Sequence, residues 1–254
     1  QLKTAASKEQ EQLKAWLAQD SQRDRFGGLL QGPSFDASGF FRSEKRDGRW
    51  YLVTPEGHPF YSLGVNTVTA SNSQTYVEGR ESMFAALPKE GEALATYFGT
   101  ADNRSGTGAA KGRGFDHGRW FDFYGANLER SYGPQTPERW VGHTLDRLQA
   151  WGFNTIGNWS EPALTAAQRV PYSLPLLIRG DYATISTGLD WWGGMPDPFD
   201  PRFAMATERA VAIAARDHRD DPWLIGYYAD NELAWAGPGD DPKSRYALAY
   251  GTLK

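Results

Sequence analysis

Asp230, Asn231 and Glu232 directly follow an apolar run, and their types and spacing suit acid and base chemistry. The run, residues 223–229, reads Trp-Leu-Ile-Gly-Tyr-Tyr-Ala and is preceded by Asp-Asp-Pro, which predicts a strand buried on both faces. Carboxylates at the carboxyl ends of parallel strands are where α/β barrels hold their active sites. Glu232 is therefore the candidate catalytic residue.

A glycosidase that retains configuration needs two carboxyl groups about 5 Å apart on opposite sides of the scissile bond. Glu232 would be one of them, and Asn231 would hydrogen-bond the sugar hydroxyl next to the reacting carbon. Asp230 lies two residues away on the same strand face, roughly 6–7 Å from Glu232, so both would approach the sugar from one side. We therefore expect Asp230 to support the site as a hydrogen-bond acceptor. The alternative for Glu232 is a helix cap or an ion pair with an arginine.

Further candidates for binding a sugar are polar or aromatic residues in predicted loops. Asn66, Asn158 and Trp159 end predicted strands, Trp191 and Trp192 precede two glycines, and Trp235 is a further aromatic residue in a predicted loop. An aromatic face in a cleft packs well on the apolar face of a sugar ring. The alternative is that the asparagines close strand ends as turn residues and that the tryptophans serve loop packing.

Other chemistries lack their motifs. The four histidines show neither close pairing nor HExxH spacing, and the chain has no cysteine, so we expect no metal and no cofactor. Ser62 and Ser160 lack a nucleophile-elbow sequence. The glycine-rich segment 104–118 lacks the Gly-Lys-Ser/Thr of a phosphate-binding loop.

Composition restricts the partner. The net charge is −4 and the basic residues form no run, which argues against nucleic acid and against a membrane surface. No apolar stretch reaches the roughly 18 residues of a membrane span, and residues 1–20 lack a signal-peptide core. Ten Trp, twelve Tyr and thirteen Phe favour a neutral, sugar-like ligand.

In the first third of the chain the sequence predicts a helix, a small antiparallel hairpin that covers the domain, one buried strand and a long insertion. Residues 7–20 read as an amphipathic helix capped by Ser7. Residues 40–45 and 49–54 read as a hairpin turning at Asp47-Gly48. A buried strand follows at 60–68, and residues 69–133 read as a long irregular lid or cleft wall.

Strands and helices then alternate. A helix begins at Thr136-Pro137 with the apolar stripe Trp140, Leu145, Leu148 and Trp151. Predicted elements follow as strand 153–160, helix 162–169, strand 174–178, helix 201–218, the strand before Asp230, and a helix near Lys243.

Four strand–helix units indicate an α/β fold with parallel strands, and four units are half of a (β/α)8 TIM barrel. A half-barrel leaves strand edges unpaired, so the rest lies outside this sequence, a partner supplies it, or the sheet is open and doubly wound. We expect a helix and linker at 1–34 and the first half of a catalytic domain at 35–254.

Four motifs carry a resemblance to a known family. They are Arg49–Gly57 (RWYLVTPEG), Trp151–Ser160 (WGFNTIGNWS), Gly193–Phe203 (GGMPDPFDPRF) and Asp230–Leu233 (DNEL). Together they resemble the β-agarases of glycoside hydrolase family fifty, from about residue 35 to the end. The resemblance implies a (β/α)8 barrel of the large retaining-glycosidase clan that cleaves β-1,4 bonds of agarose.

By this resemblance Glu232 takes the acid/base position and Asn231 the sugar-binding position before it. The family's nucleophile is a second Glu at the end of the seventh strand, and no residue here matches it. The resemblance thus implies a C-terminal half as partner, agarose or its oligosaccharides as ligand, and a secreted or periplasmic enzyme, because agarose cannot enter a cell. The alternatives are a non-catalytic galactan-binding fragment or subunit and another β-glycanase of the clan.

Overall fold

The computed structural model describes residues 1–254 except 20–21, 71–73, 103–116, 134–135, 192 and 254. The chain forms two compact units. One comprises residues 1–21, 68–153 and 161–164, and the other comprises residues 22–67, 154–160 and 165–254. The domain boundary predicted after residue 34 stays a prediction.

The second unit begins with a three-stranded antiparallel sheet of β1 (Arg42–Arg46), β2 (Arg49–Val53) and β3 (Pro59–Phe60). The predicted hairpin is confirmed, since Asp47 and Gly48 adopt φ values of 49° and 80° between β1 and β2. Positive φ at both turn residues matches the right-handed twist of a hairpin.

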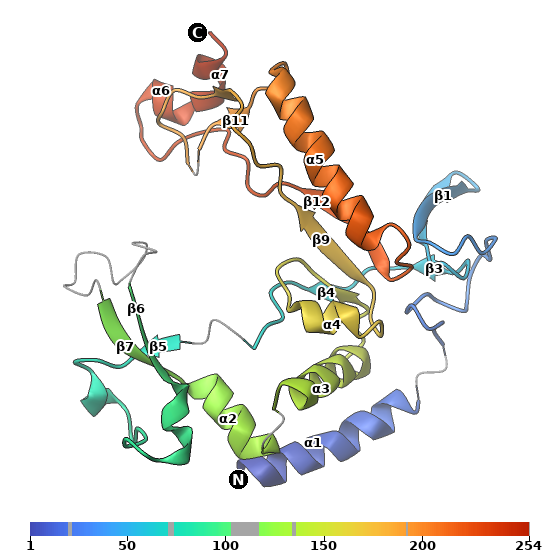
Figure 1. Ribbon diagram of the computed structural model, residues 1–254. Helices are drawn as coiled ribbons and strands as arrows, with labels where there is room; N and C mark the ends of the chain where they lie inside the picture. The colour runs from blue at the N-terminus through green and yellow to red at the C-terminus, as the bar shows by residue number, and fades with distance from the viewer. Residues whose placement is uncertain (20–21, 71–73, 103–116, 134–135, 192, 254) are drawn as a thin grey trace. The chain divides into compact units, whose positions relative to one another are not determined.

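The core of this unit is a four-stranded parallel sheet, which confirms the α/β class (Figure 1). Its strands are β4 (Gly64–Val65), β8 (Thr155–Ile156), β9 (Tyr172–Leu176) and β12 (Leu224–Ala229), paired in chain order. The predicted strand 60–68 is wrong in its extent, because Pro59 and Phe60 pair with β2 and only Gly64 and Val65 join the parallel sheet.

Strand β12 is not buried on both faces, contrary to the prediction. Leu224 to Gly226 are half-buried, whereas Tyr227, Tyr228 and Ala229 are exposed. The physical reason is its place at the end of the strand order, where β9 alone pairs with it. An apolar sequence therefore lies on a sheet edge.

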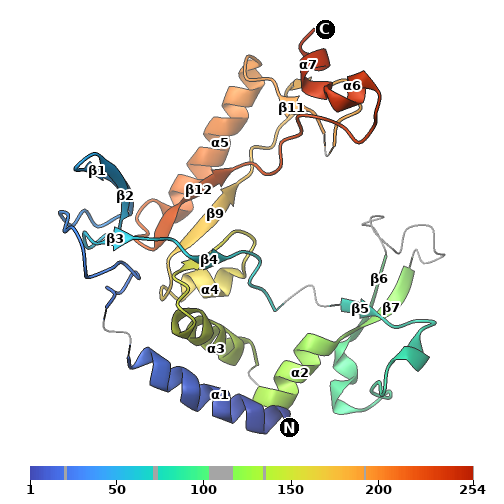
Figure 2. The same ribbon diagram turned by 180° about the vertical axis from the view of Figure 1, so that it is seen from behind.

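Helix α5 (Pro201–His218) matches its predicted bounds. It starts there because the Asp200 carboxylate accepts a hydrogen bond from the Arg202 amide and Pro201 occupies the first turn. The helix runs along β9 and β12 (Figures 1 and 2), and the Tyr227 hydroxyl donates to the Ala214 carbonyl at 3.4 Å. Because side chains alternate along a strand, Tyr228 lies on the opposite face of the sheet.

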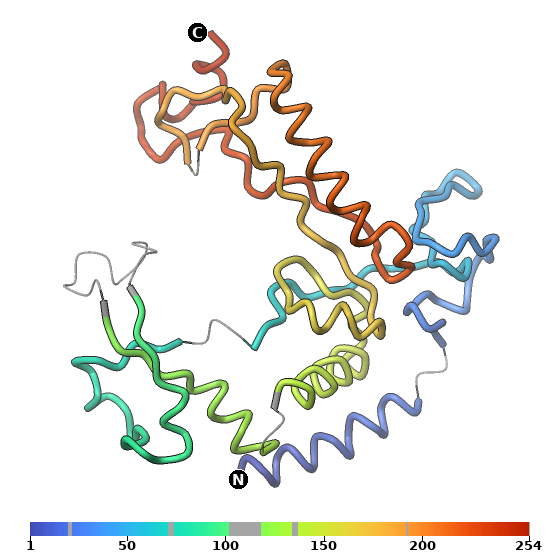
Figure 3. Tube along the Cα trace, in the orientation of Figure 1, coloured from blue at the N-terminus to red at the C-terminus, as the bar shows by residue number. Residues whose placement is uncertain are grey.

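Two short segments follow the sheet strands. The loop after β9 contains β10 (Thr184–Ile185) paired with β11 (Met195–Pro196), and the chain after β12 ends in α6 (Pro242–Arg245) and α7 (Ala247–Gly251). The two segments lie side by side (Figure 3), with the Trp191 amide donating to the Ala236 carbonyl at 3.0 Å.

The first unit holds α1 (Leu2–Leu17), α2 (Phe123–Tyr132) and α3 (Thr136–Ala150). The predicted start of the first helix at Ser7 is wrong. Ser7 lies inside α1, and its hydroxyl donates to the Lys3 carbonyl one turn back, so it caps nothing. In α3 the predicted stripe is buried at Trp140, Leu145 and Leu148, whereas Trp151 lies beyond the helix and is exposed.

The insertion at 69–133 is not irregular, in contrast to the prediction. It contains an antiparallel sheet with strand order β5 (Gln74–Tyr76), β7 (His117–Asp122) and β6 (Phe98–Asp102), and two short 3₁₀ helices, η1 (Glu81–Met83) and η2 (Ala93–Tyr97). Val77, Phe121 and Ala126 form its buried core. The remaining helix, α4 (Pro162–Ala166), is shorter than predicted. Within the described part of the chain no helix has the length and apolarity to span a bilayer.

Candidate functional site

A cleft lies at the carboxyl ends of β4, β8 and β12. Its volume is about 470 Å³, and it is lined by Asn66, Asn158, Trp159, Tyr228, Ala229, Asp230, Asn231, Glu232, Leu233 and Trp235. Each predicted lining residue lies within three positions of the end of its strand. The parallel sheet therefore brings together Asn66, Asn158, Trp159 and the Asp-Asn-Glu sequence, which are up to 166 positions apart in a 254-residue chain.

Asp230 fixes the segment that carries Glu232. Its backbone amide donates to the Leu176 carbonyl at 2.9 Å, and its Oδ1 accepts a hydrogen bond from the Ile178 amide at 2.8 Å. The carboxylate is thus directed at the neighbouring strand end. Glu232, two residues further, is exposed in the cleft.

Tyr182 holds Ile178 from its other side. Its hydroxyl donates to the Ile178 carbonyl at 2.6 Å. Burial, and after it the Asp230 charge, raise the pKa of Tyr182, so the phenol keeps its proton and stays a donor. Asp230 and Tyr182 together fix the chain that leaves β9.

Left-handed backbone recurs at the strand ends around the cleft. Thr67, Trp159, Asp230 and Glu232 have φ values of 55°, 61°, 54° and 46°. Non-glycine residues pay of order 1 kcal/mol or more for this conformation, and such residues concentrate at functional sites. The kinks turn Trp159 and Glu232 out of their strand directions.

The two asparagines differ in environment. Asn158 is 7% exposed, and its Oδ1 accepts a hydrogen bond from the Ser173 hydroxyl at 3.0 Å, so this side chain faces β9 within the sheet. Asn66 is exposed at the cleft. Asn66 is therefore the better placed of the two to contact a ligand.

The predicted tryptophans do not all line the cleft. Trp159 lies in it and is 47% exposed. Trp191 is half exposed but does not line the cleft; its backbone amide donates to the Ala236 carbonyl. Trp192 lies outside the described residues.

Two further aromatics line the cleft: Tyr228 escaped the sequence analysis, whereas Trp235 was expected there only as an aromatic residue in a loop. Tyr228 is 63% exposed and Trp235 is 72% exposed in the same cleft. The signal for Tyr228 was the two-residue period of β12, which places it on the side of Asp230. Trp235 follows Glu232 by three residues in a loop, and a tryptophan that close to a candidate acid was the available signal.

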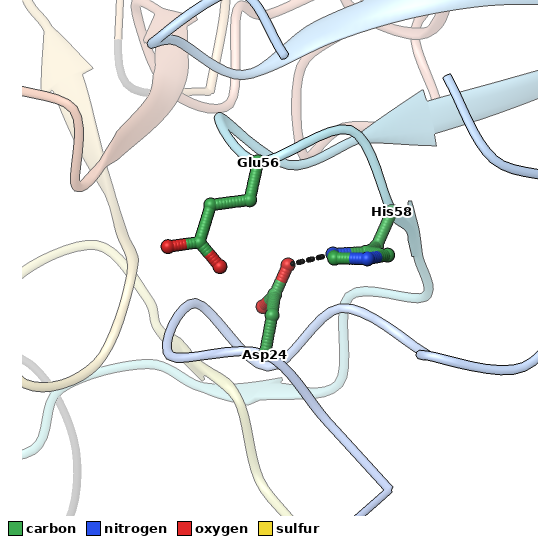
Figure 4. A group of neighbouring side chains, drawn as sticks. All are labelled: Asp24, Glu56 and His58. Atoms are coloured by element: carbon green, nitrogen blue, oxygen red, sulfur yellow. Dashed lines mark hydrogen bonds and ion pairs between the residues drawn. The ribbon is translucent and has the colours of Figure 1, made fainter. Parts of the chain in front are cut away.

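A second group of titratable side chains lies far along the chain from Glu232. Asp24, Glu56 and His58 each offer an atom within 4.8 Å of the others (Figure 4). The Asp24 carboxylate accepts from the amides of Phe26 and Gly28 and from the Thr54 hydroxyl, and its Oδ2 lies 2.8 Å from Nδ1 of His58.

Glu56 in this group pairs with Arg25 at 2.8 Å. The carboxylate oxygens of Asp24 are thus occupied by protein donors, and an arginine supplies the cation beside Glu56. This arrangement joins the segment before β1 to the turn between β2 and β3, and we assign it a structural role.

The chain is similar to β-agarases along nearly its whole length, which confirms the resemblance to glycoside hydrolase family fifty. A scan against family models gives no match. β-Agarase B of Vibrio sp. (strain JT0107) is 36% identical over 252 residues, which cover 91% of this chain and 26% of that protein. β-Agarase A of the same strain is 30% identical over 258 residues, covering 92% of this chain and 24% of its own length.

Solved structures agree with the sequence relatives. The crystal structure of an agarase, AgWH50C, superposes with a TM-score of 0.78 at 32% identity, over 98% of this chain and 36% of its own. The structure of PfGH50B superposes with a TM-score of 0.81 at 32% identity, over 99% of this chain and 38% of its own. The structure of an exo-β-agarase superposes with a TM-score of 0.74 at 32% identity, over 92% of this chain and 35% of its own. The chain thus spans about a quarter of the curated relatives and about a third of the solved structures.

Proposed function

We propose that this chain is the first half of the catalytic domain of a retaining β-agarase, and that Glu232 is its acid/base. The observation that carries the proposal is the exposed Glu232 beside Asn231 in a cleft with Trp159, in a chain 36% identical to a β-agarase. In this mechanism Glu232 protonates the leaving oxygen and then accepts a proton from the attacking water.

Further lining residues, and with them Trp191 and Trp192, would hold the sugar. Asn231 hydrogen-bonds the hydroxyl next to the reacting carbon, and Asn66 presents its amide from the other side of the cleft. Trp159 and Trp191, with Trp192, supply aromatic surface for sugar rings. Asp230 acts through its bond to the Ile178 amide and does not touch the substrate.

The edge of β12 that is unpaired within the described residues supports a (β/α)8 barrel. Four parallel strands in chain order are half of such a barrel, and the relatives are about three to four times longer than the matched region. We propose that a C-terminal half adds the remaining strands, beginning beside β12, and that it brings the nucleophile. An enzyme acting on agarose outside the cell would be secreted or periplasmic.

One observation favours a second candidate. Among the described lining residues the carboxylates are Asp230 and Glu232, and Asp230 is bonded to Ile178. A chain of these residues alone would bind a galactan without cleaving it. The second candidate is therefore a galactan-binding fragment or subunit; a further alternative is a same-clan enzyme acting on another β-glycan.

The test is Glu232→Gln in the longer protein that contains this chain. We expect turnover of agaro-oligosaccharides to fall by about 10³-fold, as for the loss of a general acid, with binding retained. An aryl glycoside whose leaving group needs no proton should still release its phenol rapidly. The matched control is Glu208→Gln, an exposed glutamate on α5, which should leave turnover unchanged.

Three results would separate the candidates. Binding without turnover in the unaltered protein supports the binding subunit. Full activity of Glu232→Gln contradicts the acid/base assignment. An inverted configuration in the first product, read by NMR, contradicts the retaining mechanism.

A further inference from the structure

Gly157 contacts the side chain of Asn66. A Cβ atom placed on Gly157 would lie 1.9 Å from Oδ1 of Asn66 and 3.0 Å from its Cα atom. Real Cβ atoms essentially never lie closer than 3.0 Å to another heavy atom, so the contact with Oδ1 excludes a Cβ atom here. Gly157 does not adopt positive φ, so the backbone conformation does not demand glycine here. What demands it is the space that Asn66 occupies.

Neither segment can move aside easily. The Gly157 amide donates to the Val65 carbonyl at 2.8 Å, and the Thr67 amide donates to the Asn158 carbonyl at 2.8 Å. These bonds clamp the ends of β4 and β8 together on either side of Asn66. A methyl group at position 157 would therefore displace the Asn66 side chain rather than the strands.

We propose that Gly157 is a positioning residue for sugar recognition: it provides the space in which the Asn66 amide lies, ready to hydrogen-bond a hydroxyl group of a galactan unit bound beside Glu232. This inference rests on the proposed function and adds to it a specific hydroxyl-binding role for Asn66. Gly157 touches no ligand itself and acts through Asn66.

The experiment is a double-mutant cycle in the longer protein, with Glu232→Gln throughout so that the ligand is not cleaved. Gly157→Ala, Asn66→Ala and the double variant are titrated calorimetrically with a defined agaro-oligosaccharide. Each single change should weaken binding about tenfold, the value of one well-made hydrogen bond. The double variant should bind no more weakly than Asn66→Ala, because removing the amide leaves the Cα atom at 3.0 Å as the nearest obstacle to the added methyl group, and a shift of a few tenths of an ångström accommodates it.

The melting temperature gives a second readout that needs no ligand. Gly157→Ala should lower it, and Asn66→Ala should restore most of that loss in the double variant. The matched control is Gly142→Ala on α3, where an added Cβ meets nothing within 4 Å and where neither binding nor melting should suffer.

The outcomes separate this inference from the proposed function. If the Glu232→Gln parent binds the oligosaccharide and Gly157→Ala binds it equally well, the inference is wrong and the proposed function stands. It is also wrong if Gly157→Ala weakens binding equally with and without Asn66. If the parent binds no agaro-oligosaccharide and the unaltered protein cleaves none, the proposed function is wrong and the inference falls with it.

Discussion

Glu232 combines a left-handed backbone with an exposed carboxylate. Its φ of 46° is costly for a side chain with a Cβ atom, and asparagine would tolerate this conformation better than glutamate. Under the proposed function chemistry explains the glutamate, since a carboxyl group can exchange a proton with a leaving oxygen and an amide cannot. On the proposed function, this position gives up some backbone stability for proton transfer.

The left-handed backbone at Glu232 predicts a difference in stability between two inactive variants. Glu232→Asn should be about 0.5–1 kcal/mol more stable than Glu232→Gln, because asparagine tolerates left-handed backbone and glutamine does not. Both variants lack the carboxylate and should be inactive. Urea unfolding of the two proteins side by side checks this, and equal stabilities would show that the backbone at Glu232 is unstrained.

Helices α1 and α3 are joined by side chains that respond to pH. Arg147 binds Glu9 through two hydrogen bonds of 2.7 and 2.6 Å, and Gln10 contacts Nε2 of His143. His143 is buried and stacks on Tyr132, and its Nδ1 has no partner among the described residues. Because the ring is buried and its Nδ1 has no described partner, this environment favours the neutral imidazole over the charged imidazolium.

Burial, and then the Arg147 charge, lower the pKa of His143 from its ordinary 6.5, against opposing effects of Asp146 and Glu9. The unfolded chain therefore takes up this proton first as the pH falls. The contribution to stability is full above about pH 6.5 and is lost as the pH falls below that value toward the lower pKa of the folded state.

His143→Phe should flatten the pH dependence of unfolding in that window, because phenylalanine keeps the ring on Tyr132 and removes the titration. The measurement is the melting temperature between pH 7.5 and 5.5. A slope unchanged by His143→Phe would show that other groups cause it.

Elements with local signals were predictable from the sequence. Asp47-Gly48 fixed the first hairpin and Asp200-Pro201 fixed the start of α5, since turn and cap chemistry act within a few residues. The sheet β5-β7-β6 was missed because its pairing joins Gln74 to Asp122 across a long separation. Glu232 followed from its strand, whereas the Gly157–Asn66 contact needs two strand ends seen together.

At the scale of the whole molecule, β12 is an apolar strand on a sheet edge, which soluble proteins normally avoid. The proposed barrel removes that edge. In the longer protein we expect the amides of β12 to exchange with deuterium as slowly as those of β9, while the edge strand β5 exchanges at least tenfold faster. Exchange of β12 at the rate of β5 would contradict a strand beside it.

The contacts around Ile178 and Leu189 have a consequence for exchanging loops between related enzymes. Ile178 is held by Asp230 and Tyr182, and the Leu189 carbonyl packs so closely on Gly237 that an added Cβ would meet it at 1.6 Å. A transplanted loop must therefore begin beyond Ile178. The segment from β10 to β11 and the segment carrying α6 and α7 should be transplanted together. Either segment alone would have to pack against the other segment of a different protein.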